Sequence, residues 1–312
     1  MSVLVLGSSG LVGRRLIRQL ADENKKVVAC DVVHPAGGRV EAAGVVYETA
    51  DIARLDQVLD VMSKHDVTDV VLLSYIMGPL MSPQHHDILL ACDVNVTGVT
   101  NVLEAARLRN VRRVLFFSTV GTYGPQRLYG ERAVTEDEFL APSSLYGRMK
   151  LLNESICDRY RALYDLDVVK VRPSAILGPG STIWPSRAIE PVARGEVGVI
   201  QYGRDARDNV IGVDDLTVLL SKILAADTLE HNVYLAGGHN VTMGQLADVI
   251  ADIVPDAEIE FPNADRTPTY PGMFDSSRAV NEFGWKVSSL ADSVRAHIDG
   301  VREEAGLPRR GA

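Results

Sequence analysis

Hydrophobic residues along the chain alternate between short apolar runs and longer segments of helical periodicity. Residues 3–6 form a continuous apolar run that ends at a glycine, and Leu11, Leu16 and Leu20 then recur at helical spacing. Further strands are expected at 27–30, 45–47, 69–73, 114–117, 168–171 and 233–235. Further helices are expected at 53–62, 85–108, 145–164, 213–226 and 243–253. Repeated alternation of this kind predicts an α/β fold with a doubly wound parallel sheet, the Rossmann architecture.

The composition changes after Pro173, where prolines and glycines become frequent and the helical periodicity is interrupted. The alternating pattern resumes later with one more helix and one more strand. We therefore expect residues 1–173, with 208–236 returning, to form the Rossmann domain. Residues 174–207 and 237–312 are expected to form a smaller, discontinuous C-terminal lobe.

Composition and charge narrow the class of protein. The chain has 312 residues, of which 46% are hydrophobic and 23% charged, as in folded soluble proteins. Its formal net charge is -9 and no block of Lys and Arg stands out, so we expect no nucleic-acid partner. There is neither a run of about 18 apolar residues nor a leader-like N-terminus, so we expect a cytoplasmic protein without membrane association. Cys30, Cys92 and Cys157 are odd in number and far apart, which argues against a disulfide framework and a zinc site.

A glycine-rich segment joins the first strand to the first helix, with the sequence Gly7-Ser8-Ser9-Gly10-Leu11-Val12-Gly13. Glycines in such a turn let a pyrophosphate approach the backbone, and N–H groups at the helix start attract its charge. Asp31 ends the next strand, where a carboxylate accepts hydrogen bonds from an adenosine ribose and repels a 2'-phosphate. The turn and Asp31 together predict a dinucleotide site that favours NAD over NADP. Arg39 nearby leaves NADP open as the lesser alternative.

Tyr146 and Lys150 lie four residues apart near the start of a predicted helix, so they share one helix face. An ammonium group beside a phenol favours the phenolate form, which lets a tyrosine carry a proton near neutral pH. For this spacing taken alone, a solvated surface pair is the alternative. Ser118 and Thr119 follow the strand at 114–117, at the sheet edge where parallel sheets bind ligands. These four side chains are candidates for one site.

In this order, the glycine turn, Asp31, Ser118-Thr119 and Tyr146-x-x-x-Lys150 resemble the extended short-chain dehydrogenase/reductase family, in its NAD-dependent epimerase/dehydratase branch. The likeness extends to Phe283-Gly284-Trp285 and so spans nearly the whole chain. The resemblance implies a Rossmann domain with a substrate lobe and NAD as the cofactor. It also implies a homodimer formed through the two long helices, at 85–108 and 145–164.

The resemblance implies a role for each matching residue. Tyr146 would be the general acid/base, Lys150 would lower the pKa of Tyr146 and bind the nicotinamide ribose, and Thr119 would hydrogen-bond the reacting oxygen. Asn95, also expected at the cofactor site, would support the fourth helix or a proton-relay water. The other residues expected to contact the cofactor are Gly7, Ser9, Gly10, Leu11, Val12, Gly13, Asp31, Asp51, Ile52, Leu73, Ser74 and Pro173.

Departures from the family pattern bear on the substrate. Ala175 stands where sugar-nucleotide members usually carry an asparagine, which weakens a nucleotide-sugar interpretation. Arg207 and Arg266 stand near the family's diphosphate-gripping arginines, with surface charge as the alternative. Ser74 and Tyr75 replace the family's usual small aliphatic pair, and residues 76–81 add an apolar loop. This loop either covers a less polar substrate or packs on the cofactor. The candidate substrate residues are Tyr75, Ser118, Thr119, Ala175, Arg207 and Arg266.

The segment His85-His86-Asp87 invites a metal interpretation. Successive helix positions point apart, however, and no third ligand has a suitable spacing. We therefore expect no bound metal and interpret the segment as a polar helix start.

These observations predict an NAD-dependent oxidoreductase. It would transfer hydride between the nicotinamide and a secondary alcohol or ketone carbon of a small, non-nucleotide hydroxy compound. The alternative is a nucleotide-sugar epimerase or dehydratase, in which the hydride transfer to bound NAD is transient. A non-catalytic dinucleotide sensor is the remote alternative, since the loss of Tyr146 or Lys150 would be its mark and both are present.

Overall fold

The computed structural model describes residues 2–35, 38–77, 87–181 and 184–310. By its internal contacts the chain divides into two compact units, each formed by several segments. Unit 1 comprises Met1–Thr122, Leu140–Arg172 and Thr217–Tyr234. Unit 2 comprises Tyr123–Phe139, Pro173–Leu216 and Leu235–Ala312. Each unit is described by itself.

Unit 1 is built on a seven-stranded parallel sheet with the strand order β10-β6-β5-β4-β1-β2-β3. Its strands are β1 (Ser2–Leu6), β2 (Lys26–Asp31), β3 (Val45–Thr49), β4 (Asp69–Leu72), β5 (Arg113–Phe117), β6 (Asp167–Pro173) and β10 (Val233–Ala236). The order reverses on either side of β1, which pairs with β2 and β4. This is the doubly wound α/β fold that the sequence predicted, and ligands of such sheets bind where the order reverses.

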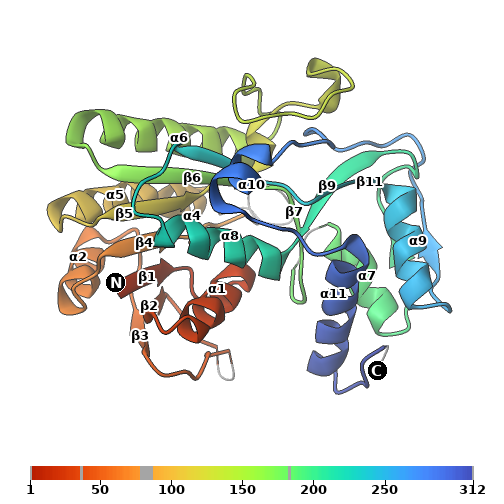
Figure 1. Cartoon of the computed structure of the whole chain (residues 1–312), viewed down its shortest axis with the longest axis horizontal. Coiled ribbons are helices and arrows are strands. Elements are labelled where there is room, and N and C mark those ends of the chain that lie inside the picture. Colours follow the sequence, from red (N-terminus) through yellow and green to blue (C-terminus); the bar gives the residue numbers. More distant parts are fainter. Residues whose placement is uncertain (1, 36–37, 78–86, 182–183, 311–312) are drawn as a thin grey trace. The chain divides into compact units, whose positions relative to one another are not determined.

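Helices cover both faces of this sheet (Figure 1). They are α1 (Leu11–Asp22), α2 (Leu55–Lys64), α4 (Ile88–Cys92), α5 (Val99–Leu108), α6 (Leu145–Tyr164) and α8 (Val213–Ala225). One hydrophobic core joins α2, α5 and α6 to the strands, and α1 and α8 lie on the opposite face. Each fully buried aliphatic side chain in such a core contributes about 1.5–3 kcal/mol, so the strand ends that carry the site are held by a rigid scaffold.

The helix expected at 85–108 is interrupted by a π-helical turn. Residues 85 and 86 lie outside the described residues, and α4 then leads into the turn η1 (Asp93–Gly98) before α5 begins. Gly98 ends the turn against Ile52, because a Cβ on Gly98 would lie 2.7 Å from a side-chain carbon of Ile52. Single π-helical turns inside helices often mark functional sites.

The run Ile88–Leu108 is, among the described residues, the one helical segment that is long and apolar enough to cross a membrane. Its α5 part buries Val99, Val102, Leu103, Ala105 and Ala106. These residues belong to the core formed with α2 and the strands, so packing within unit 1 accounts for the apolar side chains of α5. Ile88, Leu89 and Leu90 of α4 are exposed.

Unit 2 contains two small sheets that the sequence pattern did not predict. One has the strand order β11-β9-β7 and the other pairs β12 with β8. These strands are β7 (Ala175–Leu177), β8 (Gly198–Val199), β9 (Arg207–Gly212), β11 (His239–Thr242) and β12 (Ile259–Glu260). Helices α7 (Ser186–Ala193), α9 (Met243–Ile253) and α11 (Leu290–Glu304) pack around a core of their own, and α10 (Ser277–Phe283) completes the unit.

Residues Tyr123–Phe139 belong to unit 2, although they fall inside the range 1–173. The reason is backbone pairing: the Val134 N–H donates to Met273 O at 2.9 Å, and the Asp275 N–H donates to Val134 O at 3.0 Å. A segment without helical or strand periodicity thus takes its place from a partner far along the chain.

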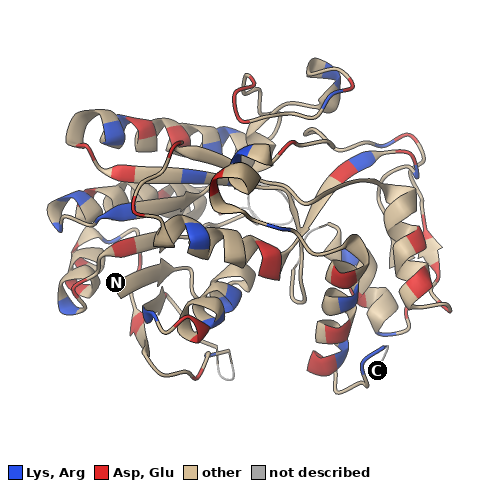
Figure 2. Cartoon of the chain, in the orientation of Figure 1, with Lys and Arg blue, Asp and Glu red and all other residues tan. Residues whose placement is uncertain are grey.

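Charged residues of both signs are interspersed along the helices of both units (Figure 2). This distribution differs from the single-sign stripe by which proteins track a phosphate backbone. That the protein has no nucleic-acid partner remains a prediction.

Candidate active site

The glycine turn lies between β1 and α1 and is held by backbone contacts on two sides. Gly7 has a positive φ of 89°, and its N–H donates to Cys30 O at 3.0 Å. A Cβ on Gly7 would lie 2.7 Å from Ser74 N and 2.9 Å from Leu73 C. Ser74 also donates its N–H to Leu6 O at 3.0 Å. The turn and the end of β4 are therefore one compact backbone unit; that they line a cofactor remains a prediction.

The three glycines of the turn meet different surroundings. A Cβ on Gly13 would lie 2.3 Å from Gly7 O, so this glycine is required by the packing of α1 on the turn. A Cβ on Gly10 would meet only Gly7 O, at 3.4 Å, and Gly10 has an ordinary backbone with φ -72° and ψ 169°. The described protein therefore leaves room beside Gly10 for a group the size of a methyl.

The start of α1 is suited to an anion. Gly10 is its N-cap residue, and the first turn, which includes Leu11 and Val12, contains no acidic side chain. The first N–H groups of a helix lack partners within the helix and carry its positive dipole end. A pyrophosphate beside Gly10 fits this geometry.

Asp31 ends β2 next to the turn. Its Oδ2 accepts the Ser9 N–H at 2.9 Å and its Oδ1 accepts the Val32 N–H at 2.8 Å. The hydroxyl of Ser9 donates to Val33 O at 2.7 Å. Val32 and Val33 are exposed apolar side chains beside this carboxylate, a feature that the sequence analysis missed.

Asp51 and Ile52 lie between β3 and α2 and have mainly local partners. Asp51 Oδ1 accepts the Ala53 N–H at 2.9 Å, and the Asp51 N–H donates to Gln57 Oε1 at 2.8 Å. Ile52 is buried against Gly98. These contacts fix the loop at the end of β3 without showing a ligand.

Asn95 is fully buried in the π-helical turn and is engaged by the loop after β4. Its Oδ1 accepts the Ile76 N–H and its Nδ2 donates to Ile76 O, both at 2.8 Å. Both polar ends of this side chain thus hold backbone. The structure shows Asn95 as a support for the loop that carries Ser74 and Tyr75. The rest of the apolar loop, from residue 78 on, lies outside the described residues.

Tyr146 lies in the first turn of α6 and contacts Thr119, which follows the end of β5. The Thr119 hydroxyl hydrogen-bonds Tyr146 and also accepts the Gly121 N–H at 3.0 Å. A Cβ on Gly147 would lie 2.1 Å from Gly121 O, so the glycine lets α6 start against this turn. Burial raises the pKa of Tyr146 to about 12, and the hydrogen bond from Thr119 offsets part of that effect.

Lys150 is buried one helical turn beyond Tyr146. Its Nζ donates to Phe117 O at 2.6 Å and lies 3.6 Å from the centre of the Tyr75 ring. The Tyr75 ring also meets the Tyr146 ring at 85°, with 5.7 Å between centres. Burial lowers the pKa of Lys150 to about 7, while the negative charge of Glu154 opposes this effect. The structure therefore brings Thr119, Tyr146 and Lys150 together and adds Tyr75 to them.

Ser118 is directed away from this group into a buried network. Its hydroxyl donates to Glu154 Oε1 at 2.5 Å. Arg172 donates to both oxygens of Glu154, at 2.9 Å and 2.6 Å, and all three residues are buried. The sequence analysis missed Glu154, although its position four residues after Lys150 on the same helix face was the available signal.

The remaining candidates belong to unit 2. Pro173 follows Arg172 at the end of β6, and Ala175 is a buried residue of β7. Arg207 is exposed at the start of β9 and donates to Met273 Sδ at 2.8 Å. Arg266 is exposed, with its guanidinium 5.6 Å from the centre of the Tyr202 ring. Neither arginine pairs with an acidic residue in the described contacts of unit 2, so surface pairing between Arg207 and Asp208 is not seen there.

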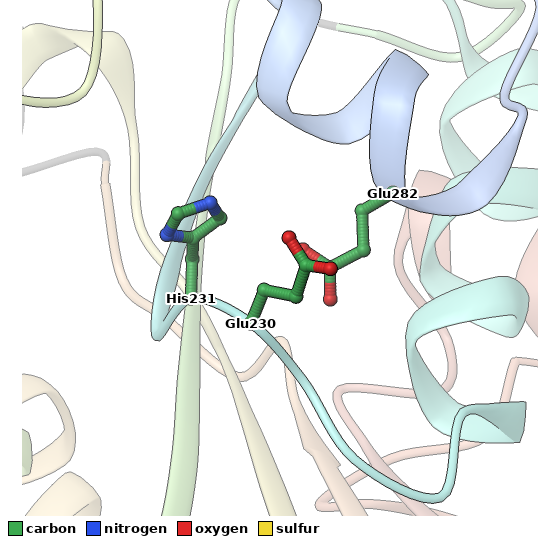
Figure 3. A group of neighbouring side chains, drawn as sticks. All are labelled: Glu230, His231 and Glu282. Atoms are coloured by element: carbon green, nitrogen blue, oxygen red, sulfur yellow. The ribbon is translucent and has the colours of Figure 1, made fainter.

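Figure 3 draws three potential metal ligands, Glu230 and His231 directly before β10, and Glu282 of α10. The first two belong to unit 1 and the third to unit 2. Neither unit alone supplies three ligands from this group, and we assign no metal site to it. His85 and His86 lie outside the described residues.

Comparison with known proteins identifies the family. The model of the NAD dependent epimerase/dehydratase family matches residues 3–237, from β1 to the end of β10. This chain belongs to that family. Its members are NAD-dependent enzymes, so NAD is the cofactor of this enzyme, which transfers hydride to and from it.

Curated relatives of this chain include UDP-glucose 4-epimerases. A UDP-glucose 4-epimerase of Mycolicibacterium smegmatis is 26% identical, over 98% of this chain and 100% of that protein. The fold matches the UDP-glucose 4-epimerase of Thermus thermophilus in complex with NAD, with a TM-score of 0.83, 22% identity and coverage of 97% and 99% of the two chains. It also matches an L-threonine dehydrogenase of Cupriavidus necator in its holo form, with a TM-score of 0.81, 22% identity and coverage of 96% and 99%.

Proposed function

We propose that this enzyme oxidises a secondary alcohol, or reduces the corresponding ketone, in a small non-nucleotide hydroxy compound with NAD as the hydride carrier. Unit 1 binds the cofactor and carries the acid/base group. Unit 2 is the substrate lobe.

The cofactor residues act through backbone and charge. The glycine turn and the first N–H groups of α1 hold the pyrophosphate, for which Gly10 leaves the space. Asp31 accepts hydrogen bonds from the adenosine ribose hydroxyls. Val32 and Val33 are apolar neighbours of the adenine. Leu73 and Ser74 form the wall opposite the turn. When bound, NAD supplies the hydride acceptor and a positive nicotinamide ring.

Tyr146 is the general acid/base. Its phenolate removes the proton of the substrate hydroxyl as the hydride leaves the carbon, and Thr119 hydrogen-bonds the same oxygen. Because burial raises the pKa of Tyr146 to about 12, the phenolate needs a neighbouring cation. Lys150 supplies that cation from the same helix face, and it also binds the nicotinamide ribose.

The substrate class is carried by Ala175. A buried methyl group stands in β7 at the position where sugar-nucleotide members usually carry an asparagine. A site built to hydrogen-bond a nucleotide sugar loses discrimination when such a partner is missing. The absent amide therefore favours a substrate without the nucleotide.

A second candidate function is the epimerisation or dehydration of a nucleotide sugar. Arg207 and Arg266 favour it, because both are exposed guanidinium groups of unit 2 and a diphosphate is matched by two such forks. The two functions differ in the fate of the cofactor, which is released with its redox state changed in the first and is restored within each turnover in the second.

The test is absorbance at the reduced-nicotinamide band with purified enzyme, NAD and separate pools of hydroxy acids, sugar acids, apolar secondary alcohols and nucleotide sugars. Net growth of the band with a non-nucleotide pool is the expected result. A silent band in all pools, together with isomer formation in the nucleotide-sugar pool, would replace this function with the second candidate.

We also propose that the enzyme is a cytoplasmic homodimer that pairs through α4, α5 and α6. Exposed apolar side chains on these helices support the proposal, among them Leu89 at 73% exposure and Leu152 at 48%. Light scattering at micromolar concentration is expected to give twice the chain mass, and Leu152→Glu is expected to shift the protein toward monomer. A monomeric wild-type protein would reject the dimer.

A further inference from the structure

The loop after β4 places an aromatic side chain where it touches both members of the proposed acid/base pair. Tyr75 contacts the Lys150 ammonium through its ring face and the Tyr146 ring at a right angle. The backbone next to Tyr75 is held in place, because the Asn95 side chain hydrogen-bonds both the N–H and the C=O of Ile76. The ring is thus packed against Lys150 and Tyr146 on a loop whose backbone Asn95 supports.

We propose that Tyr75 is a positioning residue for the Tyr146–Lys150 pair, with its ring holding the buried Lys150 ammonium beside the tyrosine. The proposal rests on the proposed function and deepens it.

The burial of the Lys150 ammonium has an energetic cost. An ammonium removed from water needs compensation, and among the described residues Phe117 O accepts a hydrogen bond from it. The face of an aromatic ring carries negative charge density, so a cation 3.6 Å from its centre is stabilised, most strongly where water is excluded. The Phe116 ring is farther away, at 5.0 Å. Tyr75 is therefore the main aromatic partner of this cation.

The other titratable groups around the pair lie on α6 and α4. Glu154 and Cys157 act on Lys150, and Tyr146 and Cys92 act on Tyr75. Glu154 is itself bound by Arg172. Glu154 and Cys157 remain in place when Tyr75 is replaced, so their effects on Lys150 are common to all Tyr75 variants.

The tyrosine and the lysine titrate as a coupled pair. The pair first loses one proton, with a midpoint set by Lys150, whose pKa is about 7 in the free protein. The remaining proton then resides on one of the two groups, and only the form with phenolate and ammonium is the active base. Loss of the Tyr75 ring destabilises both forms that contain the ammonium. The midpoint then falls and the active fraction above it falls by the same factor, while the active fraction at low pH is unchanged.

The variants are Tyr75→Leu and Tyr75→Met, which remove the ring but keep apolar bulk, and Tyr75→Phe, which keeps the ring. With the alcohol substrate and saturating NAD, we expect kcat/KM of the Leu and Met variants to reach a plateau about tenfold lower, with a midpoint about one pH unit lower. At low pH their rates should coincide with the wild type. The Phe variant should keep the wild-type midpoint. A purely structural defect would instead lower the rate by one factor at every pH.

A second measurement needs neither cofactor nor substrate. The chain contains seven lysines, and carbon-13 labelling of the lysine Cε atoms allows Lys150 to be titrated by NMR, with its signal assigned by loss in Lys150→Arg. The expected midpoint is near 7 in the wild type and in Tyr75→Phe, and about one unit lower in Tyr75→Leu and Tyr75→Met. An unchanged or raised midpoint in both ring-less variants would overturn the role of Tyr75. Failure of the proposed function would leave this titration unaffected, so the two failures are distinguishable.

Discussion

Replacing Gly10 or Gly13 with alanine separates cofactor binding from folding, because the two glycines of one turn face different surroundings. A Cβ at position 13 would lie 2.3 Å from Gly7 O, roughly 0.7 Å inside the 3.0 Å limit of real Cβ contacts. The atoms nearest to this Cβ belong to the backbone of Gly7 and Ser8, so α1 or the turn must shift. Overpacking of this kind costs about 3 kcal/mol at its upper end, and the better helix propensity of alanine returns about 1 kcal/mol. For a chain of this size the net loss of about 2 kcal/mol lowers Tm by about 4 °C.

At position 10 the protein itself tolerates a methyl group, since its one close neighbour would be Gly7 O at 3.4 Å. The cost to folding is limited to the poorer N-cap, about 1 kcal/mol or less. A pyrophosphate held against this backbone would lose its space, and overpacking by about 1–3 kcal/mol weakens NAD binding by about 5- to 150-fold.

Calorimetry gives Tm for both variants, and quenching of intrinsic fluorescence gives Kd for NAD. The expected result is that Gly13→Ala loses thermal stability, whereas Gly10→Ala keeps Tm within about 2 °C and loses affinity. A Gly10→Ala variant with wild-type affinity for NAD would refute the placement of the pyrophosphate at this turn. A Gly13→Ala variant with wild-type Tm would refute the packing argument.

Three further predictions follow from the described contacts. Asp31→Ser removes the charge that repels a 2'-phosphate, so the ratio of Kd for NADP to Kd for NAD should fall by about tenfold or more; an unchanged ratio would speak against the ribose assignment. Burial raises the pKa of Asp208 to about 7. Its protonated form therefore contributes fully to stability below about pH 4, and this contribution is lost as the pH rises through 7. Asp208→Asn should flatten the fall of Tm across that range, and parallel Tm curves for the variant and the wild type would contradict this. Arg172→Met removes the cation that binds both oxygens of buried Glu154. Chemical denaturation should show that the free energy of unfolding falls by about 3–5 kcal/mol, and a fall below about 1 kcal/mol would contradict this.

The fold of unit 1 followed from the sequence because its signals are local and strong. The continuous apolar run at 3–6 is buried as β1, and the helix predicted at 145–164 matches α6 in the structure. Unit 2 was harder to predict. Strands such as β8 and β12 have two residues each, too few for any periodicity, and they form through pairing between distant segments.

The candidate site shows the same division. Tyr146 and Lys150 were predictable because both lie on one helix, where spacing fixes the face that they share. The direction of Ser118 toward Glu154 depends on how α6 packs on β5, which the sequence pattern does not specify. The position of Tyr75 over Lys150 depends likewise on the support of its loop by Asn95, from the π-helical turn.

The central claim is that Tyr146 carries the proton for hydride transfer to NAD. The most direct measurement is the appearance of reduced nicotinamide in a single turnover, with enzyme in excess over the substrate that the pool screen identifies, because net and transient transfer are then both visible. Tyr164→Phe is the matched control, since Tyr164 is an exposed tyrosine at the other end of α6. We expect the reduced-nicotinamide band to appear in the wild type and in Tyr164→Phe. In Tyr146→Phe the band should form about 100-fold or more slowly, with unchanged affinity for NAD. Equal rates in Tyr146→Phe and wild type would contradict the central claim.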